Sequence, residues 1–325
     1  MINKYVVACK DRYFIVILST LRLLLIGGII NERGVNMDIG ISINIFSNDY
    51  SRWGDKKYRK LKEHGYSYID FNMADTDSPL YLLTEEEANK ILLAEKYAAS
   101  KDGISISQVH GPWRWPVCDF TEEDRTERME KMKRSIRATK VLGCKHFVIH
   151  PIMPFGCADL NTDKAPKTWD MNIHFMNELL KEAKENDVVI CLENMPMLEF
   201  SLARPDDILR FVKQINDDNF KICLDTGHVN VFTDLIIGDV VRKLGNEIRV
   251  LHVHDNINQQ DLHMMPTFGG IDWRDFSKSL DEIGFNGSFS LETAPSPLYS
   301  DEVYEAFSVA LVKLAKWICC LCEKS

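Results

Sequence analysis

FKICLDTGHVN, residues 220–230, joins a short apolar run to two polar side chains that can bind a metal. The run Ile222-Cys223-Leu224 predicts a buried strand, which the chain leaves through Asp225, Thr-Gly and His228. Such an ending places a carboxylate and an imidazole together at the C-terminal end of the strand. The segment therefore predicts a buried strand with two potential metal ligands at its end.

Five other apolar runs end in the same way, on a residue that can bind a metal or move a proton. They are QVH ending at His110, HFVIH at His150, VVICLE at Glu193, IRVLHVH at His252 and His254, and SFSLE at Glu292. One such ending would be an accident, but six on one sheet indicate a common site.

Short apolar runs alternate with longer helical patterns eight times from Met37 onward. The predicted strands are 38–45, 66–71, 104–110, 146–150, 188–193, 220–225, 248–254 and 288–292. The predicted helices are 56–64, 84–100, 121–142, 167–186, 205–215, 235–244, 273–283 and 301–322. We therefore predict an α/β protein with one (β/α)8 TIM barrel domain over residues 37–325. A doubly wound open sheet is the alternative, but no glycine-rich dinucleotide fingerprint follows the first strand.

The C-terminal ends of all strands in a parallel barrel meet at one face, so residues far apart in sequence converge there. Side-chain alternation places Cys191 and Glu193 on one side of their strand. It likewise places Cys223 and Asp225 on one side of the next strand. His252 and His254 also share one side of their strand. Alternation therefore cannot choose between these two histidines.

The composition is that of an ordinary soluble globular protein, with 45% hydrophobic and 27% charged residues. A net charge of -9 repels a phosphate backbone over most of the surface, so no nucleic-acid partner is expected. The nine cysteines lie partly in apolar runs and form no paired CxxC array. They indicate reduced thiols in a cytoplasmic protein.

Residues 1–36 do not resemble the rest of the chain. The apolar stretch 14–30 contains Arg22, which makes a membrane span marginal, and no clean small-x-small cleavage site precedes Met37. MDIGISINIF, which begins at Met37, reads as a first strand. We therefore predict that 1–36 is a leader or upstream extension outside the barrel, with no stable membrane span.

Several motifs occur in an order that is specific when they are taken together. They are ENMP from Glu193, DTGH from Asp225, HVHDN from His252, DLH from Asp261 with GGIDW from Gly269, and finally Glu292. In this order the chain resembles the xylose isomerase-like barrel superfamily from about Met37 to its end. That superfamily contains sugar isomerases, ketose 3-epimerases, inosose dehydratases and endonuclease IV.

The resemblance implies a divalent metal ion, Mn, Zn, Co or Mg, as cofactor. The implied ligands are Glu193, Asp225, His252 and Glu292, with His228 close by. The match favours His252 over His254 as ligand, because the ligand stands three residues before the Asp of the motif. In the endonuclease branch, further positions complete a multinuclear zinc site. The additional metal or substrate candidates are thus His110, His150, Asp261 and His263, together with His254 and Trp113.

The favoured function is a sugar or sugar-phosphate isomerase or epimerase of carbohydrate metabolism, which acts by proton transfer through a metal-stabilised enediolate. Its small-molecule substrate would be a sugar, a sugar phosphate or a polyol. Glu193 and Glu292 end different strands, so one can remove the proton and the other can return it.

Two alternatives remain, a zinc-dependent AP endonuclease and a non-catalytic barrel that binds a metal or a sugar. In favour of the nuclease, all nine ligand positions of that branch are filled by suitable residues. They are His110, His150, Glu193, Asp225, His228, His252, Asp261, His263 and Glu292. Against it, Asn194-Met195-Pro196 follows Glu193 where the nuclease branch has Asn-Thr-Ala-Gly, and the GISINIF strand lacks that branch's histidine.

Overall fold

The computed structural model describes residues 5–9, 12–16, 37–46 and 52–321. The chain divides into two compact units, Met1–Arg33 and Gly34–Ser325. In the first unit, β1 (Tyr5–Cys9) and β2 (Arg12–Val16) pair as an antiparallel hairpin. The apolar stretch predicted to lie outside the barrel falls mostly outside the described residues, so that assignment stays a prediction. Within the described part, no helix is long and apolar enough to cross a membrane.

The second unit contains eight parallel strands in the order β10-β3-β4-β5-β6-β7-β8-β9. Their bounds are β3 (Ile39–Ile43), β4 (Tyr68–Asn72), β5 (Ser105–His110), β6 (His146–Ile149), β7 (Val189–Glu193), β8 (Phe220–Asp225), β9 (Ile248–His252) and β10 (Phe289–Leu291). A parallel bridge between Val253 and Leu291 joins the two ends of this order. The predicted TIM barrel is therefore confirmed.

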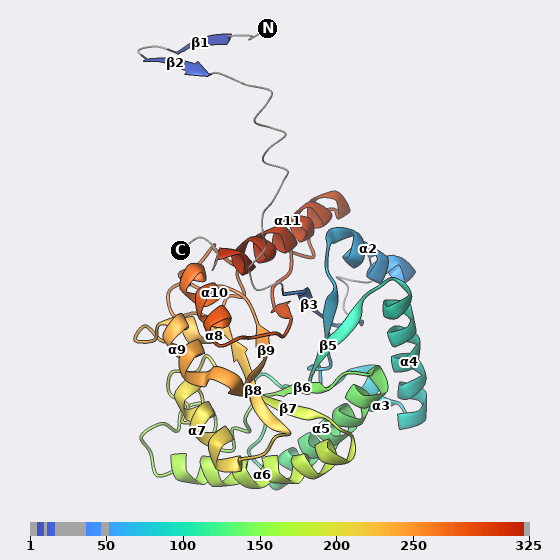
Figure 1. Cartoon of the computed structure of the whole chain (residues 1–325). Coiled ribbons are helices and arrows are strands. Elements are labelled where there is room, and N and C mark those ends of the chain that lie inside the picture. The colour runs from blue at the N-terminus through green and yellow to red at the C-terminus, as the bar shows by residue number, and fades with distance from the viewer. Residues whose placement is uncertain (1–4, 10–11, 17–36, 47–51, 322–325) are drawn as a thin grey trace. The chain divides into compact units, whose positions relative to one another are not determined.

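Helices alternate with these strands and surround them (Figure 1). The longer ones are α2 (Lys57–His64), α4 (Glu85–Lys101), α5 (Glu122–Leu142), α6 (Ala165–Glu185), α7 (Pro205–Ile215), α9 (Ile237–Leu244), α10 (Trp273–Glu282) and α11 (Asp301–Cys319). Short helical segments are η1 (Gly54–Lys56), α3 (Pro79–Leu82), α8 (Thr226–Asn230) and η2 (Gly245–Glu247).

Capping residues explain where several helices begin and end. Thr84 and Glu87 form a capping box at the start of α4, and left-handed glycines, Gly65 and Gly143, follow α2 and α5. The prediction that the last helix reaches residue 322 was wrong, because α11 ends at Cys319. Periodicity also missed α3 and α8, since a helix of four or five residues is too short to display a 3.6-residue repeat.

Inward-facing side chains of four neighbouring strands form a small apolar cluster separate from the main core. Its members are Val148, Cys191, Cys223 and Val250. Two residues further along each strand stands a predicted site residue, namely His150, Glu193, Asp225 and His252. Since side chains alternate along a strand, these polar residues continue the inward-facing positions toward the C-terminal end of the barrel. The apolar cluster is thus the layer directly beneath the candidate site.

Candidate functional site

Among the described residues, the ends of the strands and the loop after β9 bring the predicted metal-binding residues together in five groups of potential ligands, three of which together contain every predicted ligand. The first is Glu193, Asp225, His252 and Glu292; the second is His110, His150 and Glu193; the third is His228, His254, Asp261 and His263. Every predicted metal ligand belongs to at least one group. Trp113 packs against the second group through the ring of His150.

Glu193, the last residue of β7, lies at the centre with only 1% of its surface exposed. Its Oε1 is 3.1 Å from His252 Nδ1 and 3.4 Å from His228 Nδ1. Its Oε2 is 3.0 Å from His150 Nε2 and 3.6 Å from His110 Nε2. Burial by itself would raise the pKa of this carboxyl, but the surrounding imidazoles outweigh burial and hold the pKa well below its usual range. The surrounding imidazoles therefore favour the ionised form of Glu193.

His252 is oriented by a carboxylate on the other side of its ring. Its Nε2 is 2.9 Å from Asp70 Oδ2, while its Nδ1 is 3.1 Å from Glu193 Oε1 and 3.3 Å from Glu292 Oε2. Nδ1 has no hydrogen-bond partner among the described residues. A proton on Nε2 that is donated to Asp70 leaves the Nδ1 lone pair facing two carboxylates. Three electron-rich atoms in such proximity fit a divalent cation.

The electrostatic surroundings of His252 also suit a cation at this position. Burial disfavours a charged imidazole, but Cys223, Glu292 and Glu193 outweigh burial and hold the pKa of His252 well above its ordinary value. This point in the barrel therefore favours a positive charge, which either a proton or a metal ion can supply.

Asp225 acts both as a helix cap and as part of the site. Its Oδ1 accepts the backbone N–H of His228 at the start of α8, and its Oδ2 is 3.0 Å from His254 Nε2. His228 Nδ1 lies 2.7 Å from the Asn194 carbonyl, to which it donates, so Nε2 is left 3.3 Å from Asp261 Oδ2. His228 is buried, as a residue of the site should be.

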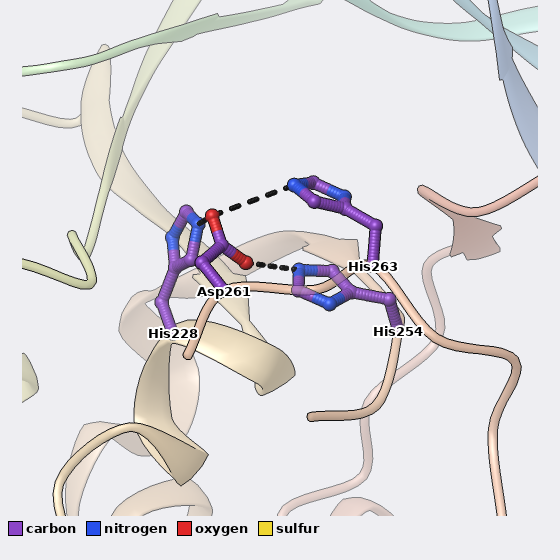
Figure 2. Close-up of side chains that lie close together, drawn as sticks. All are labelled: His228, His254, Asp261 and His263. Carbon is purple, nitrogen blue, oxygen red and sulfur yellow. Dashed lines mark ion pairs between the residues drawn. The ribbon is translucent and has the colours of Figure 1, made fainter. Parts of the chain in front are cut away.

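Three imidazoles surround the carboxylate of Asp261 in the third group, as Figure 2 shows. Asp261 Oδ2 is 3.3 Å from His228 Nε2 and 3.5 Å from His263 Nε2, and its Oδ1 is 3.8 Å from His254 Nε2. Partial burial would raise the pKa of Asp261, but hydrogen bonds from His228 and His263 lower it far below its ordinary value. His263 Nδ1 is also 2.8 Å from the backbone carbonyl of Glu292, which ties this loop to the end of β10.

A cavity of about 510 Å³ opens above these groups. Its lining consists of Asn72, Ala74, His110, Trp113, Trp115, His150, Glu193, Met195, Pro196, Met197, His228, Asp261, His263 and Glu292. Carboxylates and imidazoles from the strand ends share this lining with an apolar part made of tryptophans, methionines and a proline. None of the described residues that line it is a lysine or an arginine.

Sequence reasoning missed two residues that support the site. Asp70 in β4 and Gln108 in β5 are completely buried, and Gln108 Nε2 lies 3.2 Å from Asp70 Oδ2 and 3.3 Å from the Leu251 carbonyl. Gln108 thereby holds the carboxylate that orients His252. The available signal was a polar residue inside each of two apolar runs, YIDF and ISQVH, because a buried polar side chain needs a partner.

We expect Asp70→Asn to weaken metal binding about 10- to 100-fold, because His252 would lose the charged partner that fixes its ring. Competition with a chromophoric chelator measures this affinity directly. Asp77→Asn is the matched control, since Asp77 is exposed in the loop that follows the same strand. An unchanged affinity in Asp70→Asn would show that Asp70 serves folding alone.

The chain is similar to known proteins in sequence. A family model described as a xylose isomerase-like TIM barrel matches residues 58–308. The D-psicose 3-epimerase of Ruminiclostridium cellulolyticum is 26% identical over 257 residues, which cover 75% of this chain and 81% of that protein. The probable endonuclease 4 of Metamycoplasma arthritidis is 27% identical over 167 residues, which cover 48% of this chain and 56% of that protein.

Solved structures show the same fold. The D-psicose 3-epimerase of Clostridium cellulolyticum H10 with D-tagatose matches with a TM-score of 0.67 at 20% identity, over 87% of this chain and 99% of that chain. A D-tagatose 3-epimerase-like protein matches with a TM-score of 0.68 at 24% identity, over 87% of this chain and 98% of that chain. At such identities the likeness establishes the barrel and its topology alone.

Proposed function

The chain belongs to the xylose isomerase-like TIM barrel family, and from this premise we propose that it is a sugar isomerase or epimerase that uses a divalent metal ion. The 3-epimerase relative, which the chain matches over most of its length, supports this choice. The observation that carries it is the pair of carboxylates, Glu193 and Glu292, that face the same Nδ1 atom of His252 at the floor of the cavity.

A hydrogen on the carbon next to a sugar carbonyl is only weakly acidic. Its removal needs a base within reach and positive charge near the oxygen on which negative charge develops. Glu193 and Glu292 both line the cavity, so we propose that one removes the proton and the other returns it, either to the opposite face of the same carbon or to the neighbouring carbon.

The four residues of the first group, Glu193, Asp225, His252 and Glu292, would hold the metal ion, with His228 beside them. A divalent ion bound there would supply the positive charge that stabilises an enediolate oxygen. Asp70 and Gln108 keep the Nδ1 atom of His252 turned toward this point.

An unphosphorylated substrate suits the cavity better than a sugar phosphate. Phosphate recognition normally uses arginine, lysine or a helix N-terminus. The described lining offers no lysine or arginine, and it contains Glu193, Asp261 and Glu292. The apolar part of the lining, which includes Trp113, can instead contact the C–H faces of a sugar ring.

An AP endonuclease is the second candidate, because the other two groups of donors could hold further metal ions. A relative described as a probable endonuclease 4 points the same way. The metal content separates the two: one ion per chain in the purified protein favours the isomerase or epimerase, and two or three favour the nuclease. Elemental analysis gives this number.

The reaction itself is tested by incubating the metal-loaded protein in heavy water with a panel of free ketoses and aldoses. Deuterium should appear at the carbon next to the carbonyl, as measured by nuclear magnetic resonance. Cleavage of an abasic DNA duplex without deuterium in any sugar would replace this proposal by the nuclease. Binding of a sugar with neither reaction would identify a non-catalytic barrel.

A further inference from the structure

The aromatic part of the cavity extends from the donor groups out to the surface. Trp113 packs edge-on against His150, with ring centroids 4.5 Å apart and planes at 84°. Trp115 lies beside Trp113, with ring centroids 6.3 Å apart and planes inclined by only 28°. Trp115 lines the cavity although 62% of its surface is exposed. The two indoles thus form one row that begins at His150 and ends in solvent.

Trp113 is held rigidly at the inner end of this row. Its backbone N–H donates to the Ala74 carbonyl at 2.8 Å, and the guanidinium carbon of Arg128 lies 5.7 Å from its ring centroid. Arg128 is fixed in turn by Asp119, 2.6 Å away, and by the carbonyl of His150, 2.9 Å away. The inner indole is therefore a preformed surface at a set position relative to the carboxylates.

A single sugar ring does not use the whole row. The centroids of the two indoles are 6.3 Å apart and one indole is comparable in size with one pyranose ring, so a monosaccharide stacked on Trp113 leaves the face of Trp115 available. An exposed aromatic ring that lines a concave site is a typical ligand contact, because its burial gains apolar area at little entropic cost. Pro196 and Met197 from the loop after β7 extend the apolar lining.

We infer that the site takes a saccharide larger than one sugar ring. The reacting ring lies over Glu193 and Glu292, and a glycosyl or aryl substituent stacks against Trp115. The position of the reacting ring rests on the proposed function, whereas the contact between the substituent and Trp115 does not depend on any reaction. The substituent is uncharged, in keeping with a lining that has no lysine or arginine among the described residues.

Calorimetric titration of the metal-loaded protein with three unreactive probes tests this inference. Phenyl β-D-glucopyranoside or methyl β-cellobioside should bind about tenfold more tightly than methyl β-D-glucopyranoside, because only the larger probes reach Trp115. Trp115→Ala should reduce this preference to about twofold or less, whereas Trp115→Phe should keep most of it. Trp317→Ala is the matched control, since it removes an exposed indole from α11.

Equal affinity of the native protein for all three probes, or no binding of any of them, would overturn the inference. So would a preference that persists in Trp115→Ala, with folding of the variant verified by its thermal unfolding midpoint. The outcome is independent of turnover. If Trp115→Ala abolishes the preference but no sugar takes up deuterium, the Trp115 contact stands and the proposed reaction is rejected. If a sugar takes up deuterium but the preference persists in Trp115→Ala, the Trp115 contact alone is rejected.

Discussion

Glu193→Gln should lower deuterium incorporation into a matched sugar by about 10²- to 10⁴-fold, the usual contribution of a positioned acid or base. The amide keeps the size of the side chain but cannot accept the proton. Glu193 also lies close to four imidazoles, so its neutralisation removes the negative charge that they face and weakens the metal site as well. Incorporation should be followed by nuclear magnetic resonance at saturating metal, so that the chemical step is compared at equal occupancy.

Glu292→Gln should lower deuterium incorporation to a similar degree, because one carboxylate removes the proton and the other returns it. Glu199→Gln is the matched control, since Glu199 is exposed in the loop that follows the same strand as Glu193. If either site variant exchanged deuterium at the native rate with its metal bound, that carboxylate would not be part of the proton-transfer pair.

Asp225→Ala or His252→Ala should reduce metal affinity by more than about 100-fold, beyond the usual cost of losing an outer partner. Each substitution removes one donor of the four-residue group and leaves its buried neighbours without a counter-charge. His254→Ala should keep most of the metal in that group, because the Nε2 atom of His254 contacts Asp225 rather than Glu193 and Glu292. Elemental analysis after dialysis gives the metal bound per chain and so ranks the three variants by metal retention.

His174→Ala serves as the control for this series, since His174 is an exposed histidine on α6. Retention of metal by His252→Ala together with its loss in His254→Ala would reverse the assignment at the end of β9. Loss in every histidine variant, including the control, would trace the effect to folding instead of ligation.

The barrel was predictable because its signals are local. Apolar runs in the spacing of a strand, separated by capped helices, are visible in the sequence, and a parallel barrel brings the C-terminal ends of all its strands to one face. This is why Glu193, Asp225 and His252 could be placed together although 59 positions separate the first and the last. The family motifs added Asp261 and His263, which stand in a loop that periodicity does not describe.

By itself, then, the sequence determined the barrel, its helix caps and the set of polar residues at its mouth, since each depends on neighbours along the chain. Only the tertiary structure decided how that set divides. His252 and His254 have the same strand parity, and they separate because β9 ends at His252, so that one ring faces Glu193 and the other faces Asp225. The partner of His252, Asp70, lies 182 positions earlier in the chain. Contacts of that range depend on the closure of the barrel, which no local pattern encodes.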